Sequence, residues 1–140
     1  MNGLPKSVDV RDDTMREGLQ IESRDIPVSE KLRLLDALGE TGMKVISIGS
    51  FAHPKWTPQM ACIDEIAERF VPKPGITYTA AVFNQKGFER AAKYHPKIDV
   101  RRGRPAMHLE VGRIFSMRNY NRTPEQLLLE GDAIIERAKQ

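Results

Sequence analysis

At 140 residues, with 40% hydrophobic and 29% charged residues, the chain has the size and composition of one globular domain, which we expect to span 1–140. The formal net charge of +3 is too small to predict nucleic-acid or membrane binding by itself, and no apolar stretch approaches the roughly 18 residues of a membrane helix. A single cysteine, Cys62, excludes an internal disulfide and a multi-cysteine zinc site, and we expect a cytoplasmic protein.

The first predicted elements are a strand, a helix and a second strand. Alternating residues over 7–10 predict a short strand, and a polar stretch follows it. Ser29 offers an N-cap to a helix that Gly42 ends. The apolar face of this helix comprises Leu32, Leu35 and Leu38. The β-branched run KVISIGS at 44–50 is typical of a buried parallel strand.

A proline-bearing loop, 51–58, leads into the next predicted helix and strand. The buried face of that helix is expected to comprise Met60, Ile63, Ala67 and Phe70. The sequence ITYTAAVF at 76–83 predicts a third strand. Asn84 then caps a short helix. Its apolar face is expected to comprise Phe88, Ala91 and Ala92.

A fourth strand is predicted either at 97–100 or at 106–111, where AMHLEV alternates. The last helix is predicted from Thr123 as N-cap, Pro124 at the first position and Gln126 completing a capping box. Its buried stripe is expected to comprise Leu127, Leu128, Ala133, Ile134 and Ile135. Four strands that alternate with helices predict an α/β fold of parallel βαβ units with right-handed crossovers.

The segment DDTMREGLQ, from Asp12 to Gln20, directly follows the first strand. In parallel α/β folds, functional sites form at the carboxyl ends of the strands. A carboxylate there can hold a hard divalent cation, and Arg16 can bind a carboxylate or a developing enolate with paired donors. A solvated loop with a surface ion pair remains the alternative interpretation.

A second segment, SFAHPKWTPQM, follows the second strand. Its two prolines and Trp56 predict a stiff aromatic loop that forms a wall of a substrate site. The alternative is that Trp56 packs over the helix below.

These segments resemble hydroxymethylglutaryl-CoA lyases, within the DRE-type metallolyase superfamily that also contains isopropylmalate, homocitrate and citramalate synthases. The resemblance rests on REGLQ, on SFAHPKWTPQM, on PGITYTAAVFNQKGFERA at 74–91 and on RNYNRTPEQ at 118–126. It implies the first four β/α units of a TIM barrel, incomplete in this chain. It also implies cleavage of a carbon–carbon bond in an acyl-CoA or 2-oxo acid, with a divalent cation (Mg²⁺ or Mn²⁺) as cofactor.

Matched residue by residue, the resemblance implies that Arg16 stabilises the enolate and that Glu17 binds the metal. Gln20, Ser47 and Asn84 are then expected to contact the substrate. Ser47 stands where the family has a glutamate, and this difference removes one carboxylate from the site.

Further departures follow from the same resemblance. Glu17 replaces an aspartate, and the family's two histidine ligands, separated by one residue, have no counterpart among His53, His95 and His108. The family's glycine-flanked catalytic cysteine lies far downstream and is also missing. Cys62 falls in a helical apolar pattern, where we expect a small core side chain. We therefore expect a second copy or the missing half of the barrel to complete the site.

The leading hypothesis is a lyase, which the HPKWTPQM segment favours over a synthase-type acyl transferase acting on a 2-oxo acid. The alternative is a half-barrel that associates without catalysis. A nucleic-acid module is not favoured, because Asp99 and Glu110 interrupt the basic residues that would form it. Those basic residues are Arg101, Arg102, Arg104, Arg113 and Arg118.

Overall fold

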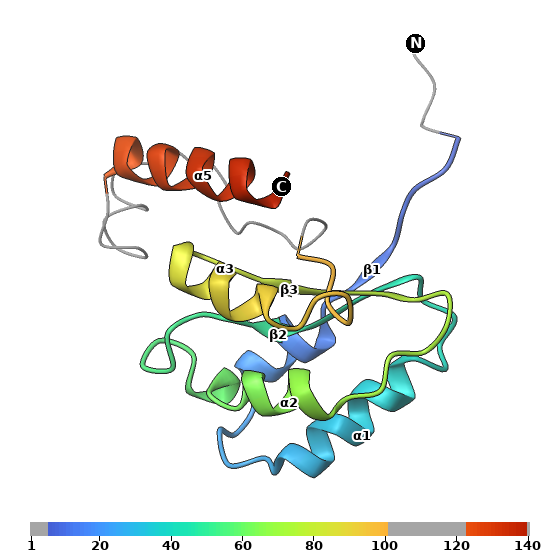
Figure 1. The fold of residues 1–140 in the computed structure, drawn as a ribbon. Coiled ribbons are helices and arrows are strands. Elements are labelled where there is room, and N and C mark those ends of the chain that lie inside the picture. Colours follow the sequence, from blue (N-terminus) through green and yellow to red (C-terminus); the bar gives the residue numbers. More distant parts are fainter. Residues whose placement is uncertain (1–5, 101–122, 140) are drawn as a thin grey trace.

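The computed structural model describes residues 6–100 and 123–139. In chain order its elements are β1 (Arg11–Asp12), η1 (Thr14–Gly18), α1 (Val28–Leu38), β2 (Val45–Ser50), η2 (Pro58–Met60), α2 (Ile63–Arg69), β3 (Thr77–Ala81), α3 (Gln85–Ala92) and α5 (Pro124–Ala138). The strands form one parallel sheet in the order β1-β2-β3 (Figure 1). The expected parallel α/β class is therefore confirmed.

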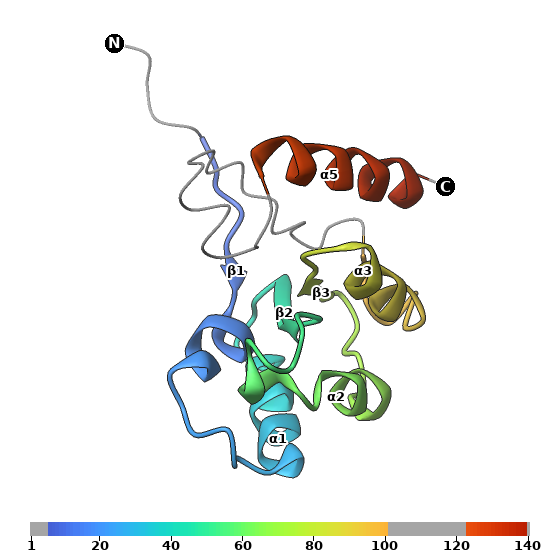
Figure 2. The ribbon, with the colours of Figure 1, turned by 90° about the vertical axis from the view of Figure 1, so that its left-hand side faces the viewer.

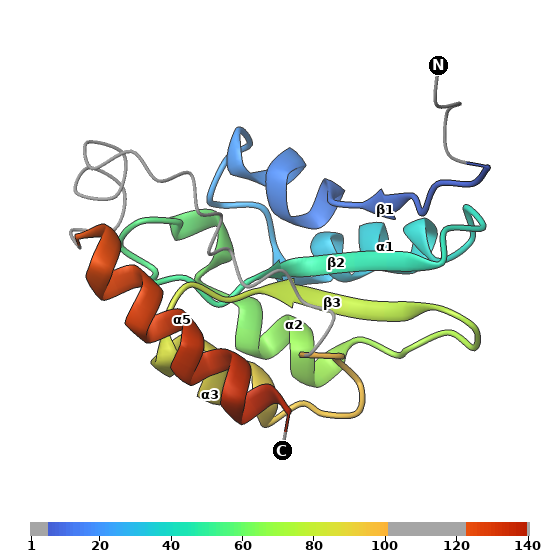
Figure 3. The same cartoon turned by 90° about the horizontal axis from the view of Figure 1, so that it is seen from above.

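The helices lie outside the sheet and follow one another in space in the same order as in the sequence. Viewed as in Figure 2, α1, α2, α3 and α5 follow one another in an arc around the strands. Figure 3 shows that β2 and β3 run in the same direction, so the segments that follow them leave the sheet at the same edge. This edge holds the carboxyl ends of the strands, where a functional site is expected in parallel α/β folds.

Strand β2 is the centre of the core, because it lies between the other two strands and is buried from Ile46 to Ser50. The expected apolar face of the following helix is confirmed, since all four of its members are buried, namely Met60, Ile63, Ala67 and Phe70. Gly49 has φ +140, and a Cβ there would lie 2.7 Å from Cδ1 of Ile63. The absence of a side chain at Gly49 thus allows α2 to pack closely on β2.

The N-terminal strand is shorter and later than predicted. Only Arg11 and Asp12 pair with β2, opposite Val45 and Ile46. The prediction of a strand at 7–10 is wrong, and Val8 and Val10 within it are 73% and 56% exposed. The reason is that alternation alone does not supply a neighbouring strand with which to pair.

Helix α1 also begins differently from the prediction. Pro27 occupies the N-cap position, and no side chain caps the helix. Ser29 therefore lies inside the first turn and is not the N-cap. The chain then turns through Gly42, whose φ of +84 suits glycine.

The fourth strand is not formed at 97–100, where the chain makes a turn. The backbone N–H of Asp99 donates to the carbonyl of Tyr78 in β3 at 2.8 Å. The alternative strand at 106–111, with His108, lies outside the described residues. The expected count of four β/α units is thus not confirmed.

Two polar clusters join the helices. Lys73 Nζ pairs with Asp36 at 3.0 Å and with Glu40, and hydrogen bonds to these carboxylates raise the pKa of Lys73. On the next helix pair, the hydroxyl of Tyr94 donates to Asp64 at 3.1 Å. Burial, followed by this hydrogen bond, raises the pKa of Tyr94.

Helix α5 confirms its predicted start and corrects its predicted burial. Thr123 and Gln126 form the capping box, with Pro124 at the first position. The stripe is not buried as expected, because its members Leu128 and Ile135 are 43% and 45% exposed; Leu129, which was not part of the predicted stripe, is 72% exposed. Among the described elements, α5 packs mainly against α3, beside which it lies in Figure 1. Within the described ranges, no helix has the length and apolar character needed to span a bilayer.

Candidate functional site

The candidate site begins at η1, a π-helical turn that follows β1. Asp12 shapes its entry, because the carboxylate accepts from both the backbone N–H and the hydroxyl of Thr14 at 3.0 Å. Met15 and Leu19 are buried and anchor the turn against the sheet. Between these two anchors, the backbone presents Arg16 and Glu17.

Arg16 is held in an acidic setting. Its guanidinium pairs with the carboxylate of Glu17 and lies 3.6 Å from Asp13. The side chain of Arg16 is 14% exposed, whereas that of Glu17 is 58% exposed. Nε of Arg16 is buried and has no hydrogen-bond partner among the described residues. A fixed guanidinium with an unsatisfied donor can bind an oxyanion, since such a ligand supplies the missing acceptor.

The segments that follow β1 and β2 are connected by Gln59. Its side-chain amide donates to the carbonyls of Gln20 at 3.1 Å and Glu22 at 3.3 Å. The carbonyl of Gln59 in turn accepts from Lys31 Nζ at 2.7 Å. The two sequence motifs therefore form one connected unit at the carboxyl edge of the sheet.

Lys31 was missed by the sequence analysis. Its side chain lies on α1, is 2% exposed, and donates to Sγ of Cys62 at 3.3 Å as well as to Gln59. A signal was present, because Lys31 lies three residues after Val28 and four before Leu35, on the apolar face of the helix. The expectation that Cys62 is an ordinary core residue is corrected in part, since it is only half-buried and faces an ammonium group.

The other predicted site residues lie elsewhere on the sheet. Ser47 is buried in β2 opposite Thr79. Asn84 is exposed after β3, and its Oδ1 accepts from the backbone N–H of Gly87 at 2.9 Å. Within the part of the chain that the structure describes, no hydrogen bond or ion pair joins Ser47 or Asn84 to the Arg16–Glu17 pair.

Trp56 does not pack over the helix below it, so that alternative is wrong. The indole is 76% exposed, with Lys55 Nζ 5.8 Å from the ring centroid. His53 is also exposed in this loop, and its Nδ1 accepts from the backbone N–H of Lys55.

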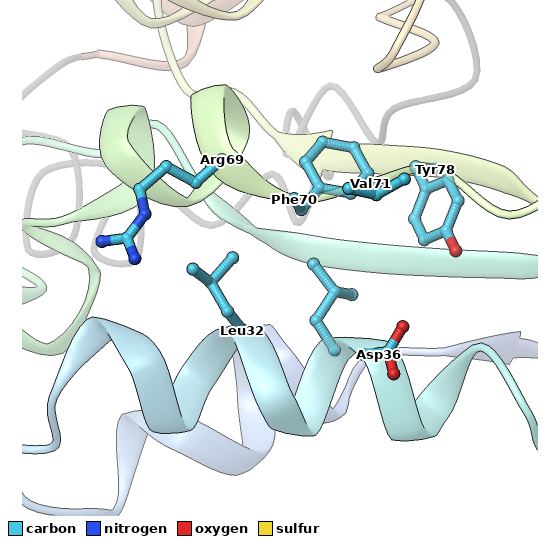
Figure 4. A pocket seen from close by; sticks show the side chains of 7 residues that line it. Leu32, Asp36, Arg69, Phe70, Val71 and Tyr78 are labelled. Carbon is cyan, nitrogen blue, oxygen red and sulfur yellow. The ribbon is translucent and has the colours of Figure 1, made fainter.

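Two pockets among the described residues lie away from these side chains. One of about 170 Å³ lies on the outer side of the sheet, where Leu32 and Asp36 of α1 face the end of α2 (Figure 4). Its remaining lining residues are Leu35, Arg69, Phe70, Val71 and Tyr78. Another, of about 500 Å³, lies by the amino ends of the strands, next to Arg11, Lys44 and Thr77. Neither contains a predicted site residue.

A relative from Pseudomonas aeruginosa, a 3-hydroxy-3-isohexenylglutaryl-CoA/hydroxymethylglutaryl-CoA lyase, is 37% identical over 137 residues. The alignment covers 98% of this chain and 44% of that protein. The human mitochondrial hydroxymethylglutaryl-CoA lyase is 34% identical over 99% of this chain and 41% of its own length. The chain is related to the hydroxymethylglutaryl-CoA lyases. Comparison with protein-family models gives no match.

Solved structures agree with this relationship. A hydroxymethylglutaryl-CoA lyase from Brucella melitensis has a TM-score of 0.80 at 30% identity, over 94% of this chain and 44% of that structure. The lyase from Bacillus subtilis has a TM-score of 0.81 at 27% identity, over 96% and 43%. The chain thus spans less than half the length of the lyases that it resembles, as the sequence motifs had indicated.

Proposed function

We propose that this chain contributes the enolate-binding side of a hydroxymethylglutaryl-CoA lyase type site, which cleaves a carbon–carbon bond in a 3-hydroxyacyl-CoA. The observation that carries the proposal is Arg16, fixed at the carboxyl edge of the sheet with a buried, unsatisfied Nε. Cleavage next to a thioester develops negative charge on the thioester oxygen. A guanidinium held in advance stabilises this charge without reorganising during the reaction.

The neighbouring residues have supporting roles in this proposal. Asp13 and Glu17 orient the guanidinium of Arg16 through their carboxylates. Gln20 and Ser47 are proposed to contact the substrate. Asn84 is proposed to do so through its amide nitrogen, because its oxygen caps α3.

A divalent cation is part of the proposal, with Glu17 as its ligand. Carboxylate oxygens suit Mg²⁺ or Mn²⁺, and such an ion polarises the substrate's oxygens when bound. However, the described residues contain no group of three His, Cys, Asp or Glu side chains arranged to hold a metal. By themselves, the described residues therefore do not fit a complete metal site. We propose that a second copy, or the barrel half that the related lyases have in addition, supplies the other ligands.

The exposed apolar surface of α5 supports the same need for a partner. Leu128, Leu129 and Ile135 place apolar side chains in solvent on one helix, and such surface favours association. The proposal is that the second copy or the other barrel half covers part of it.

Hydroxymethylglutaryl-CoA cleavage by the parent chain and by Arg16→Gln tests the function. If the proposal is right, the variant loses about 100- to 1,000-fold in kcat. Arg24→Gln is the matched control, because Arg24 lies in the following segment with a 73% exposed side chain and is expected to leave kcat unchanged. Equal turnover by the parent chain and Arg16→Gln would overturn the proposal.

Calorimetric titration with Mn²⁺ tests the metal ligand separately. The parent chain is expected to bind Mn²⁺, and the Glu17→Ala variant is expected to lose most of this affinity. Equal affinity in the variant would remove Glu17 from the proposal.

A non-catalytic half-barrel is the second candidate, and two observations favour it. Ser47 supplies no carboxylate, and the described residues form no complete metal site. Association of the chain without Mn²⁺ binding or turnover would support this candidate. A synthase acting on a 2-oxo acid is not favoured, because the relatives described above are lyases.

A further inference from the structure

Trp56 is the chain's one tryptophan, and it lies in solvent on the loop between β2 and η2. Its indole is 76% exposed, whereas Phe51, Phe70, Tyr78 and Phe88 are all buried. Large aromatic side chains usually bury most of their surface, and tryptophan is enriched at interfaces, so this indole is a candidate contact for a ligand.

The turn that carries Trp56 is fixed by hydrogen bonds. The backbone N–H of Trp56 donates to the carbonyl of His53 at 2.9 Å, and that of Lys55 donates to His53 Nδ1 at 3.2 Å. On the other side, the N–H of Met60 donates to the carbonyl of Thr57 at 2.9 Å. The indole is therefore presented on a preorganised turn, which lowers the entropy lost when a ligand binds.

The base of this loop is joined to the segment that carries Arg16. Lys31 holds the carbonyl of Gln59, and the side chain of Gln59 holds the backbone at Gln20 and Glu22. Trp56 and Arg16 thus belong to two connected segments at the carboxyl edge of the sheet. A long ligand that reaches Arg16 with its reactive end can pass over this loop with its other end.

The charge around Trp56 is positive. Lys55 Nζ lies 5.8 Å from the indole centroid, and the segment 50–63 contains no aspartate or glutamate. Among the described residues, no ion pair involves Lys55. A flat aromatic surface beside an ammonium group is suited to a nucleotide, whose base stacks on the ring while its phosphate pairs with the cation.

We propose that Trp56 and Lys55 bind the nucleotide end of the acyl-CoA substrate, with the adenine stacked on the indole and a phosphate beside the ammonium group. This inference rests on the proposed function, because it takes the substrate class from there. It adds a binding subsite on the loop after β2, remote from the bond that is cleaved.

Adenosine 3′,5′-bisphosphate, the nucleotide portion of coenzyme A, is the probe for this subsite. Since Trp56 is the chain's one tryptophan, its fluorescence reports on this loop alone. We expect saturable quenching, with the same Kd by calorimetry. By calorimetry, Trp56→Ala is expected to weaken binding about 5- to 100-fold, and Lys55→Ala about 2- to 5-fold. Lys93→Ala is the matched control, because Lys93 is exposed at the far end of α3 and leaves the Kd unchanged.

Three outcomes would overturn the inference. These are no binding of the bisphosphate, unchanged affinity in Trp56→Ala, and equal quenching by inorganic phosphate, which would indicate an unspecific anion site. Tighter quenching by a single-stranded oligonucleotide than by the bisphosphate would also overturn it, in favour of a nucleic-acid surface. None of these results depends on metal or turnover. If the bisphosphate fails to bind while Arg16→Gln abolishes cleavage, only the subsite is wrong and the proposed function stands.

Discussion

Helices α2 and α5 have comparable amphipathic patterns but different surroundings. The apolar side of α2 is buried against β2, with Ile63 and Ala67 fully inaccessible. On α5, by contrast, Leu128 and Ile135 of the predicted apolar stripe are 43% and 45% exposed, although the helix has its own capping box. The comparison teaches that periodicity specifies which face of a helix is apolar, while burial depends on whether another element is present to receive that face.

The largest difference is expected on removing equivalent apolar groups from the two helices. Ile63→Ala is expected to lower the free energy of unfolding by about 2–5 kcal/mol, because it leaves a cavity between α2 and β2. Ile135→Ala on the apolar stripe of α5 is expected to lower it by about 1 kcal/mol or less, because Ile135 is 45% exposed. Urea denaturation followed by circular dichroism measures both. Similar losses in the two variants would show that α5 is packed as firmly as α2.

A smaller effect is expected from the cap of α5. Thr123→Ala removes the hydroxyl that accepts from the backbone N–H of Gln126 at 3.3 Å, and should destabilise the helix by about 1 kcal/mol. Hydrogen exchange should become faster in α5 and stay unchanged in β2. Ser29→Ala is the matched control, because Ser29 lies in the first turn of α1 without capping it. Faster exchange throughout the sheet would mean that α5 and the core unfold together.

The smallest effect is expected at alkaline pH, at the end of α1. Hydrogen bonds to Glu40 and Asp36 raise the pKa of Lys73 above its ordinary value of 10.5. The stabilisation is therefore complete below pH 10.5 and is lost as the pH rises through the higher folded-state pKa. Above this pH, the free energy of unfolding of the parent chain should fall more steeply than that of Lys73→Met. Tyr94, whose pKa is also raised, is present in both chains and does not account for the difference. Parallel pH profiles of the unfolding midpoint would contradict this expectation.

Local chemistry was sufficient to predict much of the fold. The strand around Ile48 was evident from its run of β-branched residues. The caps at Asn84 and Thr123 were evident because each side chain accepts from a backbone N–H three residues later. Both partners of such a hydrogen bond lie within one turn of the chain, so a short stretch of sequence is enough to identify them. The start of β1 was mistaken because Val8 and Val10 alternate correctly but pair with no described strand.

The residues of the candidate site stay a prediction, and their surroundings were less accessible to sequence reasoning. Arg16 and Glu17 are adjacent in sequence, but their ion pair depends on how the η1 turn directs the two side chains. The connection from Lys31 through Gln59 to Gln20 spans three separate segments, and no local pattern specifies it. The exposure of Trp56 likewise depends on what the rest of the molecule leaves uncovered.

Gly49 has a consequence for protein engineering. A methyl group at this position would meet Ile63 and Met60, at 2.7 Å and 3.2 Å from their nearest atoms. Met60 ends the η2 turn that closes the loop bearing Trp56. A larger residue at Gly49 would therefore push this turn outward from inside the molecule. Because φ +140 also makes any side chain there strained, glycine is the residue that this position requires, and the placement of the loop bearing Trp56 depends on a residue in the strand behind it.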